Sequence, residues 1–92
     1  MKRYDFENAV YESTLDPQSK AILACYAYHK NWNNNGKVWV SSKVMAKETG
    51  LSEATVKRRV PQLVKLGWLS YQGDTKYSGG RPSKVYDLNI GD

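Results

Sequence analysis

The chain has 92 residues, of which 40% are hydrophobic, and this length suits one domain with an ordinary core. It holds one cysteine, Cys25, and one histidine, His29, which excludes a disulfide framework, a multi-cysteine zinc site and a histidine-rich metal site. We therefore expect no metal and no cofactor. The sequence also lacks an apolar run long enough to span a bilayer, and its first ten residues lack a secretory signal, so we expect a cytoplasmic protein.

Positive charge is concentrated in one part of the chain. Residues 1–36 carry four basic and four acidic side chains, whereas residues 37–84 carry ten basic and three acidic ones. Residues 85–92 carry only two acids. A local excess of this kind indicates a polyanionic partner, of which nucleic acid is the commonest, although a solvated basic surface remains the alternative.

Residues 1–14 form an N-terminal segment ahead of the domain that we expect over 15–92. Tyr4, Phe6, Val10 and Tyr11 are spaced roughly as on one face of a helix. This spacing favours a short helix packed against the domain over an arm that docks on a partner, and the aromatic residues could also form a dimer contact.

The first clear helix begins at Asp16-Pro17, because aspartate is a good N-cap and proline suits the first helical position. Ile22, Cys25, Tyr26 and His29 follow at spacings of three and four, which predicts an inward stripe. We therefore interpret Cys25 as a small core side chain without redox or catalytic function. His29 lies near the helix end, where we expect it to meet the last carbonyl groups or solvent.

The remaining elements are separated by serine caps and glycine stops. A helix that Ser41 or Ser42 caps and Gly50 ends is followed by a second one that Ser52 caps and Gly67 ends. The predicted segments are a strand-like run at 38–40, helices at 43–49 and 53–66, a strand at 68–71, a turn-rich loop at 73–83 and a returning strand at 84–88.

A helical wheel sorts the residues of the 53–66 helix at about 100° per residue. Val56, Val60 and Leu63 fall together and predict the buried face, and Arg59 falls at its edge. The exposed and flanking positions are Ala54, Thr55, Lys57, Arg58, Pro61 and Lys65. Because proline removes a helical hydrogen bond and clashes with the preceding turn, we predict a kink near 57–60 or a break after Val60.

The loop at 73–83 is a second basic element. It carries Lys76 and Arg81, and Lys84 follows directly. A glycine-rich hairpin with these charges can lie along the phosphate backbone or place an arginine in a narrow minor groove. A mobile hairpin tip with ordinary basic residues is the alternative.

Three segments carry a resemblance to a known family. They are residues 38–60, the Leu66-Gly-Trp-Leu69 run after Leu63, and the Gly79-Gly-Arg-Pro-Ser-Lys-Val-Tyr86 return. Together they resemble the winged helix-turn-helix domain of bacterial and phage regulators and of replication-protein N-terminal regions. The resemblance implies an α+β fold with a three-helix core and a C-terminal β-hairpin wing. It also implies that residues 52–59 lie in the major groove and that the hairpin flanks them.

The sequence therefore predicts sequence-specific binding of double-stranded DNA, most simply in transcriptional regulation and with dimer binding left open. Alternatives are the DNA-binding domain of a phage or plasmid replication initiator or other mobile-element factor, and a winged helix used only for protein interaction. The sequence shows no paired carboxylates, no nucleophile–histidine signature and no phosphate-binding loop. It therefore does not indicate an enzyme, and we infer no small-molecule ligand. The expected DNA-binding residues are Ser42, Lys43, Ser52, Ala54, Thr55, Lys57, Arg58, Lys76, Arg81 and Lys84.

Overall fold

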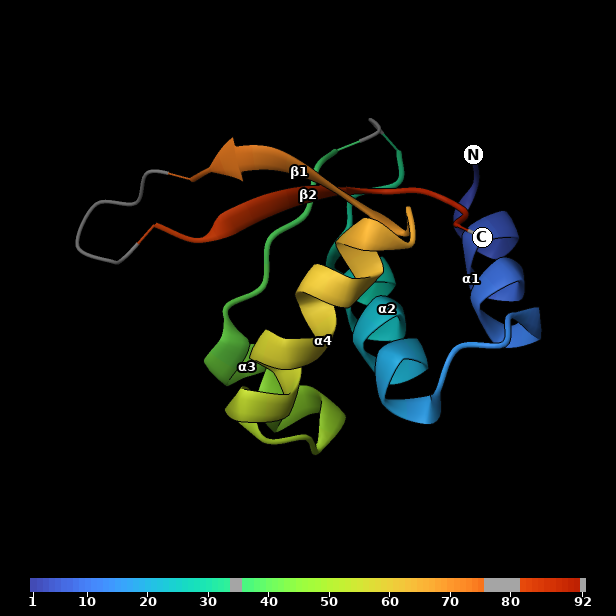
Figure 1. The fold of residues 1–92 in the computed structure, drawn as a ribbon. Helices are drawn as coiled ribbons and strands as arrows, with labels where there is room; N and C mark the ends of the chain where they lie inside the picture. The colour runs from blue at the N-terminus through green and yellow to red at the C-terminus, as the bar shows by residue number, and fades with distance from the viewer. Residues whose placement is uncertain (34–35, 76–81, 92) are drawn as a thin grey trace.

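A computed structural model describes residues 1–33, 36–75 and 82–91. Within these described residues, four helices precede a two-stranded antiparallel hairpin (Figure 1). This order is that of the α+β fold predicted from the sequence and is consistent with a winged helix-turn-helix. The elements are α1 (Arg3–Glu12), α2 (Pro17–His29), α3 (Ser42–Thr49), α4 (Glu53–Lys65), β1 (Leu69–Asp74) and β2 (Lys84–Leu88).

The predicted caps account for the helix boundaries. Asp16, Ser41 and Ser52 each accept a hydrogen bond from a backbone N–H of the following first turn, which satisfies an otherwise unpaired donor. Gly50 and Gly67 both adopt positive φ at the other ends, as the sequence predicts. The predicted boundaries of α3 and α4 are therefore correct to within one residue.

Pro61 lies inside α4, and the predicted break after Val60 is wrong. The helix continues to Lys65 because both of its halves are anchored: Val56 and Leu63 are buried on either side of the proline, and Leu66 N–H bonds to the carbonyl of Gln62. Tertiary packing thus outweighs the local cost of proline.

The N-terminal segment forms α1, which packs on the body through Phe6 and Val10. The Phe6 ring lies 6.0 Å from the Trp32 ring and 6.2 Å from the Trp68 ring, centroid to centroid. Phe6 is fully buried, so it is unavailable for the dimer contact suggested by the sequence, whereas Tyr4 and Tyr11 are exposed.

The hairpin closes over the helices. β1 and β2 pair with Leu69 opposite Leu88 and Tyr71 opposite Tyr86, and the register then shifts before Asp74 meets Lys84. β1 thus starts one residue later than predicted and runs two residues into the expected loop. The predicted strand at 38–40 is reduced to one bridge, in which Val38 exchanges two backbone hydrogen bonds with Tyr86.

One core joins all of these elements. Buried side chains come from every helix, from Val38 and from both strands, so α1 and the hairpin share a single interior with α2–α4. The buried hydrophobic residues are Phe6, Val10, Ile22, Leu23, Tyr26, Ala27, Val38, Met45, Val56, Leu63, Trp68, Leu69, Tyr86 and Leu88. Across the described segments, no helix has both the length and the apolar character that crossing a bilayer requires.

Candidate nucleic-acid interface

The turn between α3 and α4 fixes the angle of the two helices. Gly50 has φ of +77°, a conformation that residues with a side chain rarely adopt, and it reverses the chain directly after α3. Leu51 is half-buried, and Met45 and Val56 are buried on the facing sides of the two helices. This packing positions the start of α4 at the surface.

The first half of α4 presents the residues expected to read DNA. Ala54, Lys57 and Arg58 are exposed; Ala54 and Arg58 lie opposite the buried Val56, and Lys57 lies on the flank of the helix. Among the described residues, neither Lys57 nor Arg58 has a hydrogen bond or ion-pair partner. Their charges are therefore available to an anion, as the helical wheel predicts.

Ser52 and Thr55 serve the helix itself. The Ser52 hydroxyl accepts a 3.1 Å hydrogen bond from the Thr55 N–H and also contacts the Thr55 hydroxyl at 2.9 Å. Thr55 is half-buried and Ser52 is exposed at the helix entrance. Local capping is thus established for both residues, and contact with a phosphate remains a prediction.

On α3, Lys43 is exposed and Ser42 is half-buried. Lys47 is also exposed and lies one turn after Lys43, on the side of α3 opposite the buried Met45. The sequence reasoning missed Lys47, although the i, i+4 spacing with Lys43 could have identified it.

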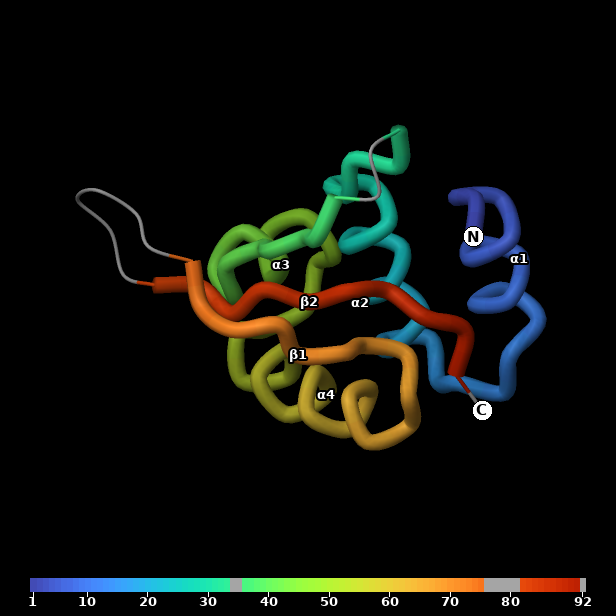
Figure 2. Tube along the Cα trace, turned by 90° about the horizontal axis from the view of Figure 1, so that it is seen from above, coloured from blue at the N-terminus to red at the C-terminus, as the bar shows by residue number. Residues whose placement is uncertain are grey.

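The hairpin projects beyond α3 (Figure 2). In the views of Figures 1 and 2 its far end lies on the side of the molecule where α3 and the start of α4 lie, and α1 occupies the other side. Lys84 is exposed at the first position of β2. The predicted contacts Lys76 and Arg81 lie outside the described residues.

Two other basic side chains, by contrast, have hydrogen-bond and ion-pair partners within the protein. Arg59 is half-buried at the edge of the core, as predicted, where its Nε donates to Gln18 Oε1 at 3.2 Å and lies 3.8 Å from a carboxylate oxygen of Asp16. Burial opposes ionisation of Asp16, but hydrogen bonds from Ser19 and the Arg59 charge lower its pKa. Arg59 therefore joins α4 to the start of α2.

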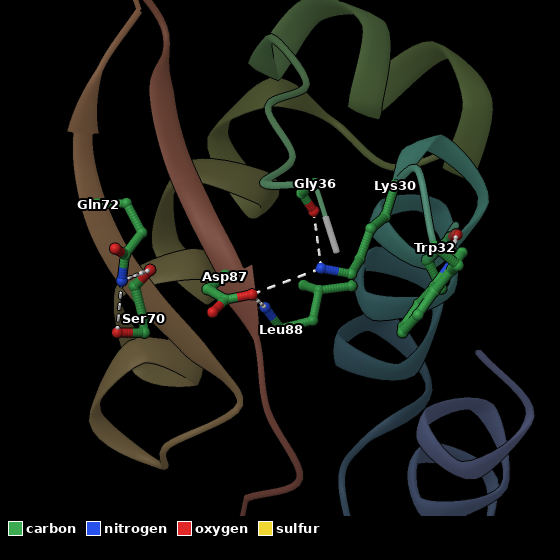
Figure 3. Close-up of polar contacts among 8 residues, drawn as sticks. Lys30, Trp32, Gly36, Ser70, Gln72, Asp87 and Leu88 are labelled. Carbon is green, nitrogen blue, oxygen red and sulfur yellow. Dashed lines mark hydrogen bonds and ion pairs between the residues drawn. The ribbon is translucent and has the colours of Figure 1, made fainter. Parts of the chain in front are cut away.

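Lys30 is the second cation with partners within the protein (Figure 3). Its side chain is only 2% exposed, and its Nζ donates to the Gly36 carbonyl at 2.7 Å and to Asp87 Oδ1 at 3.5 Å. The ammonium also lies 5.1 Å from the centre of the Trp32 ring. Lys30 thus ties the end of α2 to β2.

The outer side of α2 holds a contact between helices that the sequence reasoning missed. Glu48 Oε1 on α3 lies 2.5 Å from His29 Nε2 and 3.4 Å from Cys25 Sγ. The interpretation of Cys25 as a core residue is wrong in part, because it is only half-buried at the core margin. His29 is exposed to solvent, one of the two expected environments, and also meets Glu48. These partners lie on separate helices, so spacing along one helix could not reveal them.

The same contact shifts two pKa values. Burial, the hydrogen bond to Glu48 and the Glu48 charge together raise the pKa of Cys25 to about 12. Hydrogen bonds from His29 and Cys25 lower the pKa of Glu48. The thiol is therefore protonated and the carboxylate ionised near neutral pH.

Comparison with known families matches this arrangement. A family model described as a helix-turn-helix domain matches residues 15–69, which is more than half of the chain. The matched range contains α2, α3 and α4 and leaves α1 and nearly all of the hairpin outside. No curated protein and no solved structure matches the chain.

Proposed function

Because this chain belongs to the helix-turn-helix domain family, we propose that it binds double-stranded DNA sequence-specifically and regulates transcription. In this proposal the first half of α4 enters the major groove, α3 holds the adjacent backbone and the hairpin flanks the groove.

One observation carries the proposal: among the described residues, the exposed cations of α3 and α4 have no hydrogen-bond or ion-pair partner. Lys43, Lys47, Lys57 and Arg58 belong to the two helices that the Gly50 turn joins. The neighbouring Arg59, by contrast, is held by Gln18 and Asp16. Unpaired cations on two adjacent elements suit the phosphates of a duplex and favour a nucleic acid over a protein partner.

The side chains of α4 divide between specific and nonspecific roles. Arg58 has the planar fork that bonds to both major-groove acceptors of guanine, and Ala54 offers a methyl group for contact with thymine. Lys43 and Lys57 would neutralise phosphates, and Ser42, Ser52 and Thr55 would donate to phosphate oxygens at their helix starts. Lys76, Arg81 and Lys84 would hold the flanking backbone or minor groove.

The test begins with selection of bound sequences from a random duplex library. Arg58→Ala is then compared with wild type on the selected site and on random duplex by fluorescence anisotropy. We expect a loss of about 1–3 kcal/mol on the selected site and relaxed preference at one base pair. Arg3→Ala is the matched control, because it removes the same charge from α1 on the far side of the molecule.

The outcomes of these measurements distinguish the alternative roles of Arg58 and the alternative functions of the protein. Equal losses for Arg58→Ala on both duplexes would show that Arg58 holds only phosphate, and no binding at low salt would favour a protein-interaction module. The symmetry of the selected site reports whether one chain or two bind. Genomic sites at promoters support regulation, whereas clusters at a replication origin would replace it with initiation.

A further inference from the structure

Three side chains with metal-ligand chemistry converge between α2 and α3. Cys25 and His29 lie one turn apart on α2, and Glu48 faces them from α3. Their ligand atoms, Sγ, Nε2 and a carboxylate oxygen, all lie within 4.8 Å of one another. None of the three takes part in the proposed DNA contacts.

The ligand set suits a zinc ion. Zinc takes thiolate sulfur at about 2.3 Å and imidazole nitrogen or carboxylate oxygen at about 2.0–2.2 Å, so tetrahedral ligands lie roughly 3.3–3.8 Å apart. Cys25 Sγ lies within that range, 3.4 Å from Glu48 Oε1, whereas His29 Nε2 lies closer, 2.5 Å from the same oxygen. Small side-chain rotations therefore open the centre for an ion.

The site is also accessible and well supported. The side chains of His29 and Glu48 are 31% and 42% exposed, so an ion can enter and water can take the fourth position. Cys25 and His29 keep their i, i+4 spacing because α2 is anchored by buried Ile22, Leu23 and Tyr26.

We propose that Cys25, His29 and Glu48 bind one zinc ion, which links α2 to α3. The Cys25 thiol loses its proton to solvent and binds as thiolate, His29 binds through neutral Nε2 and Glu48 binds as carboxylate. Thiolate and imidazole together favour zinc over magnesium or calcium, which prefer oxygen ligands alone.

The test is titration of the untagged full chain with cobalt(II), a spectroscopic substitute for zinc. The chain has one cysteine and one histidine, so a thiolate-to-cobalt charge-transfer band reports Cys25 alone. We expect the band to saturate at one ion per chain and to disappear when zinc is added. Zinc should also raise the melting temperature of wild type, because the three ligands meet only in the folded chain.

Variants locate the remaining ligands. Cys25→Ala should abolish the band, and His29→Gln and Glu48→Gln should each weaken metal binding roughly tenfold or more. Glu53→Gln removes the same charge from an exposed position of α4 and should bind metal as wild type does. Circular dichroism establishes that each variant is folded.

Several results would contradict the proposed zinc site. They are the absence of a thiolate band, equal metal affinities of Glu48→Gln and Glu53→Gln, or a stoichiometry of half an ion per chain with dimer formation. The last would mean that the exposed edges of two chains share the metal. None of these measurements involves DNA, so they stand apart from the test of the proposed function.

Discussion

The basic side chains of the molecule fall into two regions with different partners. At the two ends of α2, Lys30 is buried beside Asp87 of β2 and the half-buried Arg59 of α4 lies beside Asp16. On the exposed faces of α3 and α4, Lys43 and Arg58 meet no acid among the described residues. The same residue types are thus paired within the fold in one region and unpaired at the surface in the other. Residue type and net charge alone do not separate the two uses.

The largest expected effect comes from Pro61, which lies inside α4 between the buried Val56 and Leu63. Proline costs about 3 kcal/mol relative to alanine inside a helix. Because proline also restricts the unfolded chain, up to about 1 kcal/mol of this cost is offset. We therefore expect Pro61→Ala to stabilise the protein by about 2 kcal/mol in urea unfolding. Lys65→Ala, at the exposed end of α4, should change stability by less than about 0.5 kcal/mol.

A gain in stability that comes with weaker DNA binding would show that the proline also shapes the recognition surface. Unchanged stability would mean that Pro61 destabilises α4 by less than is expected of a proline inside a helix.

Asp87→Asn tests the region in which basic side chains are paired with acids. Asparagine preserves the oxygen that accepts from Leu88 N–H but removes the charge beside the buried Lys30 ammonium. Since the Asp87 side chain is 36% exposed and the contact is long, we expect a loss of about 1–2 kcal/mol of unfolding free energy. Glu7→Gln, which breaks the exposed pair with Arg3, should cost under about 0.5 kcal/mol. Similar losses for the two variants would show that burial of Lys30 adds nothing.

Gly50→Ala tests the turn that brings the unpaired cations together. An added Cβ meets no atom within 4 Å, so the cost arises from the positive φ alone. The left-handed backbone costs roughly 1–2 kcal/mol for a residue with a side chain, partly offset by a stiffer unfolded chain, for a net loss of about 1 kcal/mol. Thermal unfolding measures this loss, and an unchanged melting temperature would contradict the strained-turn interpretation.

The smallest effect is expected for Lys47→Ala, on the α3 position that the sequence reasoning missed. Loss of one phosphate contact should reduce the slope of log affinity against log salt by about 0.9 for every duplex, with no change in base preference. Lys20→Ala is the control, because Lys20 lies on α2 and its ammonium bonds to the Tyr11 carbonyl. Equal slopes for the Lys47 and Lys20 variants would remove Lys47 from the interface.

Local rules predicted much of the fold and which side chains of α4 are exposed. Caps at Asp16 and Ser52 and the stop at Gly67 set the helix boundaries, and the periodicity of α4 separated Arg58 from Arg59 correctly. The predictions failed where distant segments decide the outcome. Pro61 stays helical because tertiary packing holds both halves of α4, and Glu48 meets His29 only because α2 and α3 fold together.

The most direct test of the two-region account is amide chemical-shift mapping of the labelled chain with its selected duplex. We predict shifts concentrated over residues 42–58 and in the hairpin, with little change in α1 or around Lys30. Shifts centred on α1, or none at low salt, would contradict the assignment of the unpaired cations to DNA.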